Sequence, residues 1–232
     1  MTQYLSANGL LVTDVDLSIP YYGLPVADIS LSTGAALTSP VTLSIGNLTL
    51  TMALDSLPSG SPATQTFAGI TTARLIGGAG KWRTVVTLPP YRAPPGTAGV
   101  LMSSVLRDLA TMTGERVSVA SGSDRALGPF YVTEPGAPAS RVLQILAGSL
   151  WWVDAQGVTQ VASSRPTSTI ASFAGVEHVD GGRGWNTVST EDPQSWVPGA
   201  TYTGPTASFA IAATRIRADG KSGSMRMEVL SA

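Results

Sequence analysis

The sequence predicts a mainly β protein with a small α/β insertion that contains two short helices. Among its 232 residues, 25 Gly and 16 Pro divide the chain into short segments, which favours strands and turns over long helices. Apolar and polar residues alternate with a period of two near both ends of the chain, as in half-buried strands. Between them, residues 101–112 and 138–148 show the apolar spacing of helices.

The N-terminal part predicts short strands and one well-defined hairpin. Over residues 9–31, Asp14 and Asp16 are expected on a solvated strand face. Residues 41–52 predict a hairpin around Gly46-Asn47, because Gly at the first turn position is typical of a type II′ turn. Such a turn would place six apolar side chains on one face: Ile45 with Leu48, Leu43 with Leu50 and Val41 with Met52.

The following segment is rich in turn-forming residues. Residues 55–66 predict a loop. Strands are expected at about 67–76 and 82–88, joined by the glycine-rich residues 77–80. The proline-rich residues 89–96 predict a stiff, extended linker and a natural domain boundary.

The middle of the chain predicts two helices and a hairpin. The first helix covers about 101–112, with Gly114 as its left-handed cap. The second runs from about Pro138 to Gly148, and its expected buried stripe is Val142, Leu143, Leu146 and Leu150. Residues 151–161 then predict a strand, a tight turn opened by Asp154 and closed by Gly157, and a returning strand.

From about residue 165 the chain is predicted to be β again. Its clearest part is residues 209–229, where two strands are joined near residues 218–223. In the last strand, Met225, Met227 and Val229 alternate with charged residues, which predicts one buried face.

Charge and composition exclude several classes of function. The chain has 14 Lys and Arg against 15 Asp and Glu, so it lacks the basic surface that non-specific nucleic-acid binding needs. No apolar run approaches the ~20 residues of a membrane span, and residues 1–4 do not resemble a signal peptide. With no Cys and with His178 as the single His, disulfides, Cys-ligated metals and multi-His metal sites are excluded. A chain with only 12% charged residues has a sparsely charged surface, which is explained equally well by partners that cover it and by a compositional bias toward Ala, Gly and Thr.

The candidate catalytic motifs are weak. Residues 77–81 look like a phosphate-binding loop, but the template fails at Leu75 and Trp82, so we expect a turn between strands. The acid–His cluster of residues 177–180 precedes a glycine-rich loop, so we expect His178 to be a loop histidine rather than a base. The neighbouring carboxylates Asp14 with Asp16, and Glu191 with Asp192, are expected on a strand face and in a turn. No catalytic, cofactor-binding or metal-ligating residue is predicted, and we expect a protein that is not an enzyme.

The adjacent Trp151 and Trp152 could stack on sugars or bases. On a strand, one ring should be buried and the other presented outward. Packing in a core or an interface is the favoured interpretation, because large aromatic residues usually anchor such contacts.

Three stretches in this order resemble one family. The first is residues 99–117, a short helix that leads into a strand. The second is residues 140–158, a helix followed by an aromatic strand and an Asp-x-x-Gly turn. The third is residues 195–201, with Val-Pro-Gly-Ala-Thr at 197–201, followed by the strands of 211–230. Together they resemble the late-control family, the baseplate hub proteins of tailed phages and of contractile injection systems.

This resemblance implies a fold and a structural role. It implies two β-barrel-like tube domains, at residues 1–95 and at 169–232, that flank a small α/β domain at 96–168. The chain is short for the family, so a trimmed barrel is expected, with the second barrel as the candidate. It implies a hub at the baseplate or tail tip of the virion, made in the host cytoplasm, that joins the tail tube to the spike or fibre complex. The implied partners are two further copies in a homotrimer, the tail tube or distal tail protein, the spike, fibre or central tail-tip protein, and the tape-measure protein. DNA would pass through the channel without specific binding.

The sequence also suggests contact residues for such a hub and leaves three alternative functions open. We expect interface contacts from Tyr21, Tyr22, Trp151 and Trp152, with Trp152 as an exposed ring. One alternative is a distal tail or tube-completing protein that forms a hexamer. Another is a carbohydrate-binding tail-tip adhesin module that uses Trp151, Trp152 and Trp185. The remaining one is a cell-wall hydrolase that depends on Glu177 or His178.

Overall fold

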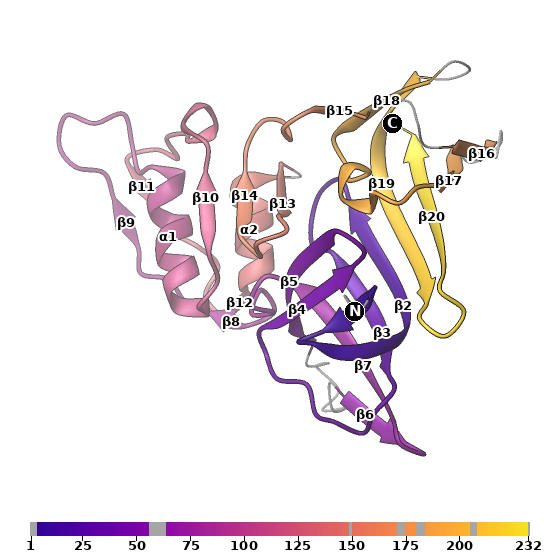
Figure 1. Cartoon of the computed structure of the whole chain (residues 1–232). Coiled ribbons are helices and arrows are strands. Elements are labelled where there is room, and N and C mark those ends of the chain that lie inside the picture. The colour runs from indigo at the N-terminus through magenta and orange to yellow at the C-terminus, as the bar shows by residue number, and fades with distance from the viewer. Residues whose placement is uncertain are drawn as a thin grey trace.

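The computed structural model describes residues 4–55, 64–148, 150–170, 175–179, 184–204 and 208–231 (Figure 1). The expected mainly β architecture with two helices is confirmed. The strands form a 13-stranded sheet, a 3-stranded sheet and two 2-stranded ribbons. The helices lie together on one side of the molecule, away from the large sheet (Figure 1).

A closed six-stranded barrel forms the N-terminal part. Its strands neighbour one another in the order β1-β4-β5-β7-β3-β2, and β1 pairs with β2 to complete the circle. Their bounds are β1 Leu5–Ala7, β2 Leu10–Pro20, β3 Val26–Leu31, β4 Val41–Ile45, β5 Leu48–Leu54 and β7 Ile70–Gly77. Alternate residues of each strand point inward, so that side chains such as Leu17, Leu31 and Met52 are fully buried.

The expected hairpin of residues 41–52 is confirmed in its register. Val41 lies opposite Met52, Leu43 opposite Leu50 and Ile45 opposite Leu48. Gly46 has a φ of 57°, as the first position of a type II′ turn requires. All six paired apolar side chains are buried, which is why this register holds.

The expected loop at 55–66 is wrong at its end, and residues 56–63 lie outside the described part. Residues Thr64–Phe67 form strand β6, which turns at Ala68-Gly69 and pairs with β7. The strand expected at 67–76 therefore begins only at Ile70. The sequence does not indicate this turn, because Ala68 has a φ of 50°, a backbone conformation that residues other than Gly, Asn and Asp seldom adopt.

The helical part has a hydrophobic core of its own. Helices α1 Met102–Thr113 and α2 Ala139–Ala147 pack beside a sheet of β10 Val117–Val119, β14 Thr159–Val161 and β13 Trp151–Val153. Gly114 caps α1 with a φ of 75°, as expected. The stripe of α2 is buried at Val142, Leu143 and Leu146, whereas Leu150 lies beyond the helix and is 38% exposed, which corrects the prediction for that residue.

Two short ribbons replace the expected strand at 82–88 and the expected linker. Only β8 Val85–Val86 is a strand in the first segment, and it pairs with β12 Ala137–Pro138. Within the proline-rich segment, β9 Tyr91–Arg92 pairs with β11 Phe130–Tyr131. A short 3₁₀ helix, η1, covers Ser121–Ser123. The core of the helical part already includes Trp82, Val86 and Leu88, so residues before 96 pack with it.

The C-terminal strands extend the sheet of the barrel. They are β15 Ser168–Ile170, β16 Gly175–Val179, β17 Trp185–Ser189, β18 Ala200–Thr203, β19 Ser208–Asp219 and β20 Ser224–Ser231, with a 3₁₀ helix η2 at Pro193–Ser195. β19 pairs with β2 over seven residue pairs, from Ala213 opposite Pro20 to Asp219 opposite Asp14. Within the described residues these strands do not close into a second barrel.

One hydrophobic core therefore serves both ends of the chain. Buried side chains of the barrel lie in the same cluster as Ile216, Met227 and Val229 of the C-terminal strands. The division at residues 95/96 and 168/169 stays a prediction. No helix in the described ranges is long and apolar enough to cross a membrane.

Candidate interaction site

The helical part joins the barrel through a short stretch of backbone pairing. The Gly23 N–H donates to the Trp151 carbonyl at 2.8 Å, and the Val153 N–H donates to the Gly23 carbonyl at 3.0 Å. Nearby, the Thr51 N–H of β5 donates to the Ala155 carbonyl at 2.8 Å. These bonds continue the sheet edge at β13 onto the segment that follows β2, which fixes the two parts relative to each other.

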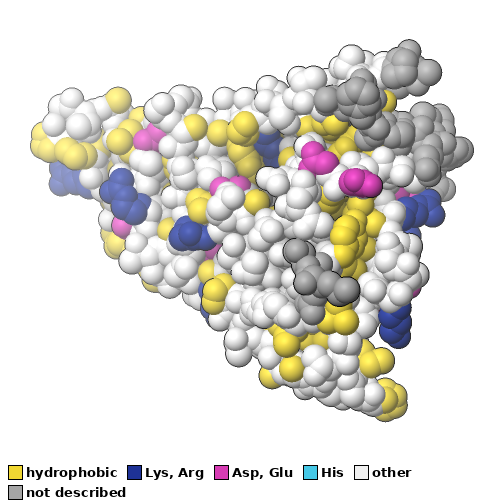
Figure 2. Space-filling view, viewed as in Figure 1, with side chains coloured by type: hydrophobic (Ala, Val, Ile, Leu, Met, Phe, Trp, Pro, Cys, Tyr) yellow, Lys and Arg dark blue, Asp and Glu magenta, His cyan; other side chains and the backbone are white. Residues whose placement is uncertain are grey.

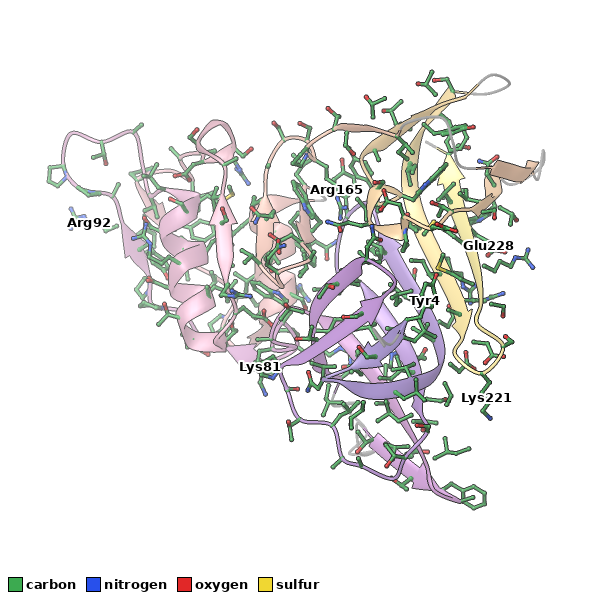
Figure 3. All side chains as sticks on the ribbon, in the orientation of Figure 1. Tyr4, Lys81, Arg92, Arg165, Lys221 and Glu228 are labelled. Atoms are coloured by element: carbon green, nitrogen blue, oxygen red, sulfur yellow. The ribbon has the colours of Figure 1, made fainter. Side chains whose placement is uncertain are left out.

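Arg165 lies at this junction and connects three segments (Figure 3). Its side chain donates from Nη2 to the Pro20 carbonyl at 3.1 Å and from Nη1 to the Pro198 carbonyl at 3.2 Å. The guanidinium carbon lies 5.5 Å from the centroid of the Tyr21 ring and 5.0 Å from that of Trp152. Cation–π contacts of this kind are worth about 2 kcal/mol or more when desolvated.

Burial defines the electrostatics of Arg165. The residue is 8% exposed, and its Nε has no hydrogen-bond acceptor. Burial lowers the pKa of the guanidinium to about 10, so the group remains charged at neutral pH. Within the described residues no carboxylate forms a salt bridge with it.

The four predicted contact residues differ in their surroundings and in their exposure. Tyr21 and Tyr22 form an edge-to-face pair with ring centroids 4.6 Å apart, and Tyr22 is 38% exposed. Trp152 is only 6% exposed, so the expectation of an exposed ring is wrong there: the residue packs against Arg165. Trp151 points to the opposite face of β13 and lies half-buried, 6.5 Å from Trp82 between ring centroids. An interface role for these residues stays a prediction.

The glycine-rich turn that resembled a phosphate loop holds a carboxylate of its own chain. Glu115 is 5% exposed, and its Oε2 accepts from the Ala79 N–H at 2.9 Å. Its Oε1 accepts from the Lys81 N–H at 2.6 Å. The turn thus presents backbone donors to an anion, but the anion is the side chain that follows α1. This contact ties the end of β7 to the helical part.

A polar face runs across the continuous sheet formed by β7, β3, β2, β19 and β20. Directly paired residues place Arg74 beside Asp28, Asp28 beside Asp16, and Asp16 beside Arg217. The acids on this face are Asp14, Asp16, Asp28, Asp219 and Glu228, and the bases are Arg74, Arg215, Arg217 and Arg226. Each of these arginines lies within salt-bridge distance of a carboxylate.

Asp16 is the centre of this network. Its carboxylate accepts from Arg215 Nε at 2.9 Å and from Arg215 Nη2 at 2.5 Å, and from Arg217 Nε at 3.4 Å. The hydrogen bond with Arg215 is the main reason why the pKa of Asp16 lies below its ordinary value. Asp14 and Asp16 therefore lie on a solvated strand face, as expected, and Asp16 is engaged in ion pairs.

The other candidate groups are dispersed. Asp192 accepts hydrogen bonds from Ser195 and from Asn47, which lower the pKa of its carboxyl, and Glu191 is exposed next to it. The side chains of Glu177 and His178 lie outside the described part. Among the side chains that are described, no three of His, Asp or Glu gather as metal ligands. Figure 2 shows Lys and Arg scattered over the visible face without forming one basic patch.

Comparisons with known proteins identify the fold. No family model matches the chain, and no curated protein matches it by sequence. Among solved structures, a tail protein from Neisseria meningitidis MC58 has a TM-score of 0.63 at 13% identity, over 98% of this chain and 96% of that one. A tail protein of prophage MuSo2 from Shewanella oneidensis has a TM-score of 0.63 at 12% identity, over 98% and 97%.

A third solved structure comes from a secretion system. It is an E. coli component of the type VI secretion system that exhibits structural similarity to the T4 bacteriophage tail proteins gp27 and gp5. Its TM-score is 0.59 at 10% identity, and the match covers 97% of this chain and 75% of that one. The resemblance drawn from the sequence is thus confirmed for the fold.

The sequence pointed to aromatic residues of the junction but missed its charged ones. Arg165 and Glu115 interact with residues that are distant along the chain, and neither belongs to a recognisable motif. The only signal in the sequence was that charged residues are rare in this chain. A charged side chain that becomes buried needs specific partners, so each of the few charged residues is a candidate for such a contact.

Proposed function

We propose that the protein is a structural component of a phage tail and that it forms the baseplate or tail-tip hub between the tail tube and the spike or fibre complex. The observation that supports this most is the match of nearly the whole chain to the fold of two tail proteins and a type VI secretion component. The proposed location is the tip of the virion tail.

Trimeric assembly is part of the proposal. Each chain offers a closed barrel and a second group of strands joined to it through β2 and β19. Three copies would supply six β units around one axis, which adapts a sixfold tube to a threefold spike. The proposed neighbours are the tube or distal tail protein on one side, the spike, fibre or central tail-tip protein on the other, and the tape-measure protein within.

The polar sheet face supports a channel that DNA crosses without binding. Affinity for DNA depends on basic side chains that replace the counterions of phosphates. On the face centred on Asp16, the arginines are already paired with carboxylates of the same sheet. We assign this face to the channel, and the exposed Tyr22 to contacts with a neighbouring subunit.

Copy number in the particle tests the hub role. Immunoelectron microscopy should label the tail tip, and quantitative mass spectrometry of purified particles should give three copies per tail. Six copies would favour the distal tail alternative, and absence of the chain from particles would refute both. The adhesin alternative has less support, because Trp152 is buried and Trp151 and Trp185 are half-buried.

A further inference from the structure

A pocket of about 320 Å³ opens beside Arg165, where the barrel, the helical part and the C-terminal strands meet. Most of its lining is apolar, and residues from all three segments contribute to it: Ile19, Leu50, Trp152, Arg165, Ser168 and Pro198. Its volume is at the lower end of the range of small-ligand pockets and is large enough for one or two side chains.

The pocket contains a cation, Arg165, that forms no salt bridge within the described chain. Leaving a buried charge without a counter-charge is costly, and a guanidinium has five donors of which the described contacts use two. Asp154 also lines the pocket, but its own turn occupies its carboxylate. Its Oδ1 accepts from the Gln156 and Val158 N–H groups at 3.0 and 2.9 Å, and its Oδ2 accepts from the Gln160 side chain at 2.7 Å.

An open strand edge borders the same pocket. β15 pairs in parallel with β18, and no other described strand pairs with it. Ser168, the first residue of β15, lines the pocket. A peptide that adds to a free strand edge gains main-chain hydrogen bonds and directs alternate side chains into adjacent pockets.

We infer that this pocket binds an acidic side chain on an extended peptide segment of a neighbouring protein, which pairs with the edge of β15 that no described strand occupies and brings its carboxylate to Arg165. An apolar residue near the acid would contact the apolar lining. This assignment rests on the chemistry of the pocket and is independent of the proposed hub role.

Peptide binding to the full chain tests the inference. The probe is a fluorescein-labelled peptide of sequence Thr-Val-Leu-Glu-Val-Thr, compared with the same peptide carrying Gln in place of Glu. We expect the Glu peptide to bind about tenfold more tightly or better, as for a charge-assisted hydrogen bond. Equal dissociation constants for the two peptides, or no binding by either, would overturn the inference.

Three variants assign the effect to the pocket. Arg165→Gln removes the charge on which the preference depends and should abolish the preference for Glu. Gln194→Glu, an isosteric change in the pocket lining, should supply a carboxylate from within and remove the preference even if Arg165→Gln does not fold. Arg92→Lys, at the far end of the helical part (Figure 3), should leave the preference intact. A preference that survives Gln194→Glu, or N-acetylglutamate that competes as well as the peptide, would contradict the assignment to a peptide in this pocket.

Discussion

The contact between Glu115 and the glycine-rich turn should contribute measurably to the free energy of unfolding. In Glu115→Gln, an amide NH2 group replaces one of the two carboxylate oxygens, and this group donates hydrogen bonds but cannot accept one from a backbone N–H. The native acceptor oxygens lie 2.9 Å from the Ala79 nitrogen and 2.6 Å from the Lys81 nitrogen. In the variant, one of these two partly buried N–H groups loses its acceptor. Removing a charged acceptor from such a bond costs about 1.5–3 kcal/mol.

That loss is large enough for calorimetry. For a protein of this length, 1 kcal/mol corresponds to about 2–4 °C in Tm, so a loss of 2 kcal/mol predicts a decrease of roughly 4–8 °C. Hydrogen exchange adds a local readout, because Glu115→Ala should accelerate exchange of the Ala79 and Lys81 amides before that of the barrel amides.

The matched control removes a similar charge from an exposed pair. Glu134 lies 3.0 Å from Arg141, and the two side chains are 55% and 61% exposed. Glu134→Gln should therefore cost no more than about 1 kcal/mol. If Glu115→Gln and Glu134→Gln lower Tm equally, the turn does not depend on the buried carboxylate and the reasoning fails.

Three further substitutions test other parts of the structure. Gly77→Ala would place a Cβ 2.6 Å from the Pro25 ring and should lower the free energy of unfolding, measured by chemical denaturation, by about 1–3 kcal/mol. Gly122→Ala is the control, because the space around its Cβ is open, and it should leave the stability unchanged. Equal effects of the two substitutions would refute the close approach of Gly77 to Pro25. Asp16→Asn should cost less than about 1 kcal/mol at pH 7, because the pair is partly exposed. Since the pKa of Asp16 is lower in the folded than in the unfolded chain, this difference should disappear as pH falls below the ordinary Asp range, and a difference that persists in acid would contradict the ion-pair origin. Tyr22→Ala should leave Tm within about 2 °C of the native value, as for an exposed side chain, but should reduce incorporation into particles; unchanged incorporation would remove Tyr22 from the interface.

The parts that were predictable from the sequence are those fixed by local pattern. The hairpin of residues 41–52 combines a two-residue turn with alternating apolar residues, and a slip by one residue would expose all six. Helix α1 ends at Gly114 because that position needs a left-handed conformation, which glycine adopts without strain. The tight turn after Trp151–Val153 likewise follows from Asp154, whose carboxylate accepts the N–H groups of the turn.

The parts that were not predictable depend on contacts between distant residues. Nothing near Trp152 in the sequence indicates that Arg165 will cover its ring, so local alternation alone could not decide which Trp is buried. The anion held by the glycine-rich turn is likewise 34 residues or more away along the chain. The pairing of β2 with β19, which joins the two ends of the molecule, is a choice of topology that no local signal specifies.

A cryo-electron microscopy map of the assembled tail tip tests the central proposal most directly. The account predicts three copies of this chain in one closed ring between the tube and the spike or fibre complex, with the sheet face around Asp16, Arg215 and Arg217 toward the channel. A ring of six copies, or a ring whose channel is lined by other elements while this face is buried between subunits, would contradict it.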